Sequence, residues 1–147
     1  MTFETSIYSH EIVEKHYFSF GKVFFLSNIL VTEFNEGIVF TYEHAKEFIH
    51  QAEAFYGNTD FYYISNRINS YSVNPIDWLK INNKYQNLKA ICFVNKNKVG
   101  KRFLKVERLF CKHPIKEFNF LHEAVEWINA KEALDRNKNI ILNKKLI

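Results

Sequence analysis

The sequence predicts a single α/β domain with one mixed sheet of about five strands and four helices. Apolar strand-like runs alternate along the chain with segments whose apolar residues recur at helical spacing. The first two strands are joined by a short turn, which predicts a hairpin, whereas helices separate the later strands and predict parallel crossovers. The chain has 147 residues, 47% of them hydrophobic, which is enough for one ordinary core.

The predicted hairpin occupies the first third of the chain. Residues 17–26 alternate apolar and polar side chains and then become apolar throughout, with Gly21 at the natural site of a bulge or bend. Ser27 and Asn28 mark a turn, and the alternation resumes over 29–34. Both segments are therefore predicted to be strands.

A helix is predicted to begin at Thr41 and to end before Gly57. Thr41 is a favourable N-cap residue, and glycine is the usual residue just beyond a helix. The apolar residues between them recur every three or four positions, which predicts one buried helix face.

The next strand, residues 61–65, is apolar on both faces, as in the middle of a covered sheet. A loop rich in Asn and Ser follows it, and Pro75 is suited to the first position of a second helix. Further strands are predicted over 88–94 and 115–118, with a final helix capped by Asn119. We expect the domain to span residues 1–134 and to be followed by a basic tail, 135–147, with a frayed end.

A third helix is predicted to begin near Asn97 and to carry an apolar stripe opposite a basic face. This basic surface consists of Lys98, Lys101, Arg102, Lys105 and Arg108. This surface could bind the phosphates of a nucleic acid or lie on an anionic membrane. The interpretation that we favour is an ordinary surface helix whose apolar stripe faces the core. The net charge of +4 is attributed to an AT-rich codon composition, and we do not expect nucleic acid as a partner.

The loop after residues 61–65 is the predicted binding site, because sites in α/β folds lie beyond the carboxyl ends of strands. The guanidinium fork of Arg67 is suited to a phosphate or carboxylate. The alternative is that Arg67 ties the loop to backbone carbonyls. The predicted binding residues are Ser65, Asn66, Arg67, Asn69, Ser70, Tyr71 and Ser72.

Motifs for catalysis and for metal or cofactor binding are not evident in the sequence. His122 and Glu123 begin an HExxH-like pattern, but its second histidine is missing. Cys92 and Cys111 form no CxxC pair, and no leader or run of roughly 20 apolar residues is present. We therefore expect a cytoplasmic protein without enzymatic activity, metal or cofactor.

Two segments resemble the SpoIIAA-like proteins of the STAS superfamily. The run NILVTEFNEGIVFTYEHAKEF is similar to their second strand and first helix, and KEFNFLHEAVEWI is similar to their closing element. The resemblance covers roughly Tyr17 to Ile128 and implies a STAS-type α/β fold. In that family the best-known members are anti-sigma-factor antagonists phosphorylated on a serine, and other relatives are thought to bind lipids or nucleotides.

The phosphorylation switch of the antagonists is not carried over to this chain. They have an Asp-Ser-Ser-Gly-like tetrapeptide, whereas this chain has SNRINSYSVNP, in which Ser65, Ser70 and Ser72 lack the matching neighbours. The resemblance implies a non-enzymatic regulatory or ligand-binding module, with a protein or a small apolar or anionic molecule as partner. The alternative function is a carrier of a lipid or other apolar ligand. A homodimer is compatible with the sequence.

Overall fold

The computed structural model describes residues 1–81, 87–95, 109 and 111–145. These residues form a mixed sheet of six strands in the order β1-β2-β3-β5-β7-β8. Strands β1 to β3 are antiparallel, and β3, β5, β7 and β8 are parallel to one another. The strands are β1 Glu14–Phe18, β2 Gly21–Phe25, β3 Ile29–Phe34, β5 Phe61–Asn66, β7 Leu88–Val94 and β8 Ile115–Phe118.

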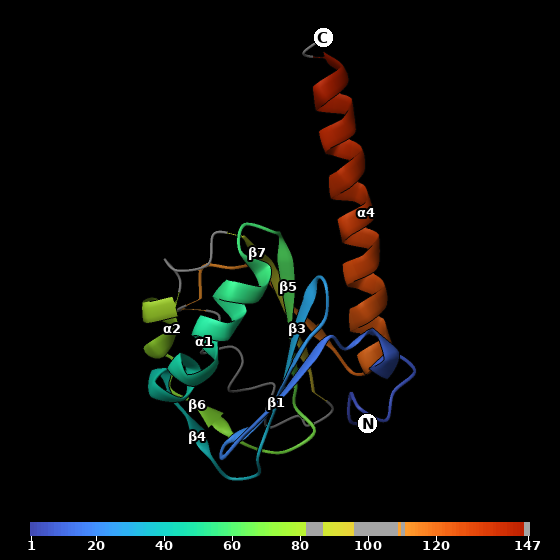
Figure 1. Ribbon diagram of the computed structural model, residues 1–147. Coiled ribbons are helices and arrows are strands. Elements are labelled where there is room, and N and C mark those ends of the chain that lie inside the picture. Colours follow the sequence, from blue (N-terminus) through green and yellow to red (C-terminus); the bar gives the residue numbers. More distant parts are fainter. Residues whose placement is uncertain (82–86, 96–108, 110, 146–147) are drawn as a thin grey trace.

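Helices cover both faces of the sheet, as Figure 1 shows. Helix α1 (Tyr42–Tyr56) and the short α2 (Asp77–Ile81) lie on one side, here called the α1 face. The long helix α4 (Leu121–Lys145) covers the other side, the α4 face. A 3-10 turn, η1 (Ser9–Glu11), lies in the N-terminal segment. The mixed α/β class is confirmed, but the sheet has six strands instead of about five. The predicted number of four helices is not matched either, since the described residues contain the α-helices α1, α2 and α4.

The additional strand arises because residues 17–26 do not form one bulged strand. Phe18 pairs with Gly21, so the chain reverses at residues 19–20 and separates β1 from β2. Gly21 has a φ of +153°, and a Cβ on it would lie 2.5 Å from the carbonyl oxygen of Glu33. Gly21 therefore follows directly on a chain reversal and permits a close approach of β2 to β3, so of the two predicted features the bend is present and the bulge is not.

The central position of residues 61–65 is confirmed, since β5 lies between β3 and β7. Two further short strands, β4 (Val39–Phe40) and β6 (Ser72–Val73), pair in parallel next to the main sheet. They were not predicted, because two residues are too few to show a periodic pattern.

The predicted start and end of α1 are confirmed at Thr41 and Gly57. The backbone N–H of Thr41 donates to Nδ1 of His44 at 3.2 Å, and that of Tyr42 donates to the buried carboxylate of Asp77 at 2.9 Å. Asp77 belongs to α2, so it satisfies an N–H in the first turn of α1 and holds the two helices together.

Helix α4 packs through its first two turns, with Leu121, Ala124, Val125 and Ile128 buried against the sheet. Residues 135–145, predicted as a tail, continue the same helix, so the predicted domain boundary falls within α4. Within the described residues, no helix is both long and apolar enough to cross a membrane.

Most of the predicted basic helix lies outside the described residues. This applies to its predicted start at Asn97 and to the basic surface of Lys98, Lys101, Arg102, Lys105 and Arg108. Pro75, predicted to open the second helix, precedes α2 in a turn, and α2 is described only as far as Ile81.

Replacing Gly21 with alanine should destabilise the protein by about 2 to 4 kcal/mol, because the new methyl group would meet backbone atoms of β3. Gly57→Ala is the matched control: its φ is +54°, but no atom lies within 4 Å of the added Cβ. Only the conformational cost of about 1 to 2 kcal/mol should remain there. Urea unfolding of both variants measures the difference, and equal losses would contradict a steric role for Gly21.

Candidate binding site

A cleft of about 770 Å³ lies at the carboxyl edge of the parallel strands. Its walls are the loop after β5, the start of α4 and the N-terminal segment. The cleft has the size of a small-molecule site. Its lining consists of Met1, Thr5, Ser6, Ile7, Tyr8, Asn66, Arg67, Ile68, Asn69, Ser70, Tyr71, Val94, Asn95, Asn119, Phe120, Leu121 and His122.

The lining combines one strong cation with amides and apolar side chains. Four of its residues are asparagines, Arg67 supplies a guanidinium, and the described lining contains no carboxylate. Ile7, Ile68 and Phe120 add apolar surface. This chemistry is suited to a ligand that has an anionic group and an apolar body, because arginine and amide N–H groups are hydrogen-bond donors.

Arg67 is held at the point where the cleft meets the α1 face. Its backbone N–H donates to the carbonyl of Val94 at 2.9 Å, which continues the pairing of β5 with β7. The guanidinium carbon lies 4.2 Å from the ring centre of Phe93 and 5.1 Å from that of Tyr71. Such cation–π contacts orient the guanidinium and contribute about 0.5 to 1 kcal/mol each at exposed sites.

A chain of hydroxyl groups supports Arg67 from the α1 face. The buried hydroxyl of Ser65 lies 2.8 Å from that of Tyr71 and 3.4 Å from Nε of Arg67. Thr32 on the neighbouring strand β3 and Tyr63 on β5 share a hydrogen bond of 2.6 Å, and burial raises the pKa of Tyr63 above its ordinary value. The hydrogen bonds of Tyr63 and Tyr71 fix the end of β5.

Asn66 points to the opposite face and contacts Glu33. Its amide donates to Oε2 of Glu33 at 2.6 Å and to the carbonyl of Met1 at 3.1 Å. The same carboxylate oxygen accepts the backbone N–H of Phe3 at 2.7 Å. Burial raises the pKa of Glu33, although the bonds from Phe3 and Asn66 oppose that shift. Its other oxygen, Oε1, is buried without a partner among the described residues.

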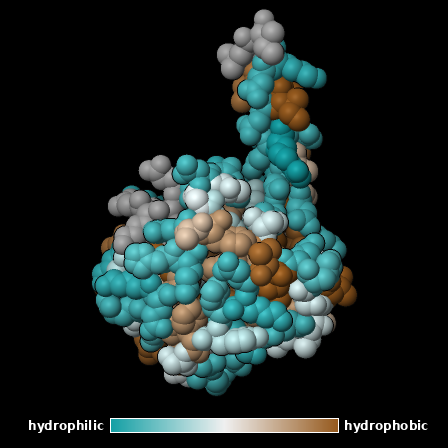
Figure 2. All heavy atoms as spheres, viewed as in Figure 1, coloured by the Kyte–Doolittle hydropathy of each residue, from teal (hydrophilic) through white to brown (hydrophobic). Residues whose placement is uncertain are grey.

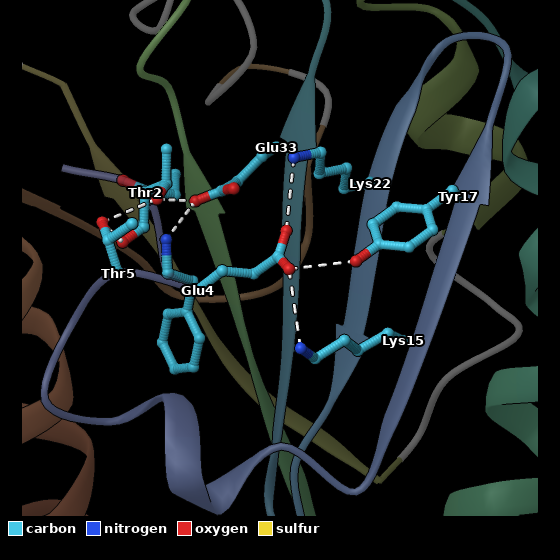
Figure 3. A network of polar contacts seen from close by, with 9 residues as sticks. Thr2, Glu4, Thr5, Lys15, Tyr17, Lys22 and Glu33 are labelled. Carbon is cyan, nitrogen blue, oxygen red and sulfur yellow. Dashed lines mark hydrogen bonds and ion pairs between the residues drawn. The ribbon is translucent and has the colours of Figure 1, made fainter.

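The N-terminal segment is fastened to the sheet by a second carboxylate, as Figure 3 shows. Glu4 accepts a bond from the hydroxyl of Tyr17 at 2.9 Å and from Nζ of Lys22 at 3.2 Å, and Lys15 lies 3.5 Å away. Burial alone would raise the pKa of Glu4, but the bonds from Tyr17 and Lys22 bring it below its ordinary value. The segment that forms one wall of the cleft is thus held by Glu4 and Glu33.

The loop after β5 is fixed by hydrogen bonds to the end of β3 and to the segment that follows it. The amide of Asn69 donates to the carbonyl of Phe34 at 3.0 Å, and the N–H of Ser70 donates to Glu36 at 2.6 Å. The carbonyl of Ser70 accepts the N–H of Gly37 at 2.7 Å. These contacts give the cleft wall a defined shape, although it is a loop.

Five of the seven predicted binding residues line the cleft: Asn66, Arg67, Asn69, Ser70 and Tyr71. Ser65 is buried beneath them, and Ser72 belongs to β6, where its N–H pairs with the carbonyl of Ile38. Neither lines the cleft, so the structure does not bring all seven side chains together.

Several lining residues were not predicted. Asn95 and Asn119 directly follow β7 and β8, the two strands that continue the parallel part of the sheet beyond β5. Polar residues after adjacent parallel strands meet at one edge, so this signal was available in the sequence. Residues 5–8 also line the cleft, but no signal in the sequence pointed to them, because no repeating pattern marks that segment.

Within the described residues, no group of three or more His, Cys, Asp and Glu side chains could hold a metal ion. Cys92 is buried between strands, which raises the pKa of its thiol to about 12. Cys92 is therefore a structural thiol and not a nucleophile.

The fold is similar to that of a known structure. An uncharacterized protein of the DUF3478 family from Shewanella loihica PV-4, described as having a SpoIIAA-like fold, superimposes with a TM-score of 0.52. The match covers 78% of this chain and 90% of that protein at 15% sequence identity. No family model and no curated protein sequence matches the chain. The SpoIIAA-like fold predicted from the sequence is therefore confirmed.

Replacing Glu33 with glutamine should change how stability depends on pH. The pKa of Glu33 in the folded protein lies above its ordinary value of 4.5. Protonated Glu33 therefore contributes its full stabilisation of the folded state below pH 4.5, and this contribution is lost as pH rises through the folded pKa. Glutamine does not ionise. The free energy of unfolding of the wild type should therefore fall relative to that of Glu33→Gln as pH rises from about 4.5 towards neutrality.

Denaturant unfolding across this pH range measures the effect. Glu47→Gln is the matched control, because Glu47 is exposed on α1. Its unfolding free energy should run parallel to that of the wild type at every pH. A parallel course for Glu33→Gln as well would show that Glu33 is not buried as a charge in solution.

Proposed function

We propose that the protein is a non-enzymatic binding module for a small molecule with a carboxylate or phosphate group and an apolar body. The observation that carries this proposal is the cleft at the carboxyl edge of the sheet, whose described lining has Arg67 and four asparagines but no carboxylate. A negative charge placed there meets N–H donors and no opposing acidic side chain among the described lining residues.

The position of Arg67 supports recognition by a preformed site. Phe93, Tyr71 and Ser65 fix the guanidinium, so ligand binding would cost little side-chain entropy. The same contacts are compatible with the alternative role of Arg67 as a residue that ties the loop to the sheet. The two roles differ in what an Arg67 substitution changes, which is binding in one case and stability in the other.

The alternative of a carrier for a wholly apolar ligand has less support. The apolar cavity beneath α1 has a volume of about 60 Å³, with Phe34, Phe48 and Phe61 among its lining residues. Ligand pockets usually have volumes of about 300 to 1,000 Å³, so this cavity would have to expand before it could take a lipid chain. The cleft has the necessary volume, but its polar side chains favour a ligand with a charged group.

A regulatory role is part of the proposal, since the resemblance to SpoIIAA-like proteins implies a regulatory or ligand-binding module. The described part of the cleft shows no nucleophile paired with a base, which supports a module without its own catalysis. His122 lines the cleft, and none of its described contacts is with a nucleophile or a carboxylate.

Anionic probes should raise the melting temperature of the wild type and have a much weaker effect on Arg67→Gln. We suggest benzoate and phenyl phosphate, because each joins an anionic group to an apolar ring. Loss of a charge-assisted hydrogen bond of about 1.5 to 3 kcal/mol should weaken binding by at least about tenfold. Thermal melting against probe concentration, followed by calorimetry, measures this change.

Two further variants separate binding from stability. Arg67→Lys keeps the charge but loses the planar fork, so its affinity should be intermediate. Arg136→Gln removes an exposed arginine from α4, away from the cleft, and should bind like the wild type. If the Arg67 variants melt several degrees lower yet bind the probes as the wild type does, Arg67 ties the loop in place and the site lies elsewhere.

A further inference from the structure

The C-terminal part of α4 projects beyond the domain, as Figure 1 shows. All residues from 136 to 145 are exposed, and the last described contacts between α4 and the rest of the domain are those of Glu132 with Asn28 and of Asp135 with Tyr62. A helical segment of about ten residues is only marginally stable in water by itself. The helical conformation of the projecting turns would therefore be stabilised if another surface packed against them.

The projecting helix carries large apolar side chains in water. Leu134, Ile140, Ile141 and Leu142 are each 52% to 59% exposed, and Figure 2 shows hydrophobic side chains gathered near the end of this helix. The spacing of Trp127, Leu134 and Ile141 is seven residues, so they lie close to one line along α4. We call these three residues the α4 stripe.

Leu134 and Ile141 of the α4 stripe are free of the described contacts that hold α4 to its own sheet, whereas Trp127 packs against Phe118 of β8. The mean direction of the sheet-facing residues Leu121, Ala124, Val125 and Ile128 lies roughly 130° around the helix from that of the stripe at 100° per residue. Leu134 and Ile141 are exposed, and Trp127 is partly buried against Phe118. A second helix could therefore pack along the stripe without displacing the sheet.

The charges of α4 are divided between its two halves. Residues 121–135 contain four carboxylates, Glu123, Glu126, Glu132 and Asp135, and one lysine. Residues 136–145 contain four basic residues, Arg136, Lys138, Lys144 and Lys145, and no acidic residue. A helix of this kind attracts a second copy of itself in the antiparallel direction and repels it in the parallel direction.

We propose that α4 is a homodimerisation helix, on which a second copy of the chain packs antiparallel along the α4 stripe. Leu134 lies near the two-fold axis, and Ile141 of each protomer packs close to Trp127 of the other. The basic half of each helix then faces the acidic half of its partner, and the two domains lie at opposite ends of the helix pair. Such an interface is isologous, as in most dimers. This proposal does not depend on ligand binding at the cleft.

Sedimentation or light scattering across chain concentrations up to about 100 μM should show a monomer–dimer equilibrium that weakens at high salt. Leu134→Gln with Ile141→Gln should raise the dissociation constant at least about tenfold, because both side chains are buried in the dimer. Ile140→Gln with Leu142→Gln is the matched control. It removes two similarly exposed apolar residues from other sides of the helix, so dimerisation should persist.

Charge reversal tests the direction of the pairing. Lys144→Glu with Lys145→Glu places negative charges at the C-terminal end of α4, where the antiparallel partner brings Glu123 and Glu126. Glu123→Lys with Glu126→Lys places positive charges at the other end, where the partner brings Lys144 and Lys145. Each variant alone should be monomeric, whereas an equimolar mixture should form a heterodimer. Glu123 also accepts the N–H of Phe120 at the start of α4, so Glu126→Lys alone serves as a second variant that keeps this contact.

Three results would overturn the proposal. One is a wild type that stays monomeric at low salt, and a second is equal loss of dimer in the stripe and control variants. The third is a failure of the charge-reversed variants to pair when mixed. If a monomeric wild type instead binds vesicles of phosphatidylcholine and phosphatidylserine, and Lys144→Glu with Lys145→Glu abolishes that binding, the surface faces a membrane and not a second copy.

Discussion

The burial of β5 on both faces is the constraint on which the rest of the structure depends. A strand between two parallel neighbours and two helical layers has no solvent at its sides, so polar groups at its end need protein partners. Ser65 is bonded to Tyr71 on the α1 face, and Asn66 is bonded to Glu33 on the α4 face. These two bonds fix the first turn of the following loop and thereby place Arg67 at the cleft.

The α4 face shows how one carboxylate organises distant segments. Glu33 takes an amide from β5 and a backbone N–H from the N-terminal segment, while Phe3 is fully buried in the same core. Burial of this carboxylate is costly, and its second oxygen has no partner among the described residues. This buried carboxylate lies where the N-terminal segment closes one side of the cleft. Side chains that destabilise the fold are commonly found at functional sites.

The sequence predicted the strong, long-range patterns of the fold and missed the short ones. The caps of α1, the central position of residues 61–65 and the SpoIIAA-like fold were predictable, because periodicity and turn residues mark them over many positions. The turn between β1 and β2 was missed because Gly21 suits both a bulge and a close strand approach. In the candidate site, Arg67 and its neighbours followed from their place after β5. The wall formed by Thr5 to Tyr8 depends on tertiary contacts alone.

The burial of Phe3 beside the first turns of α4 has a consequence for the order of folding. These two parts of one core are separated by more than a hundred residues of sequence, so their contact carries a high loop-closure entropy. The α1 face, by contrast, is built largely from consecutive elements between β2 and β5. The α1 face can form while the chain is incomplete, whereas the α4 face must wait for both ends. The protein should therefore fold through closure of the α4 face as its slowest step.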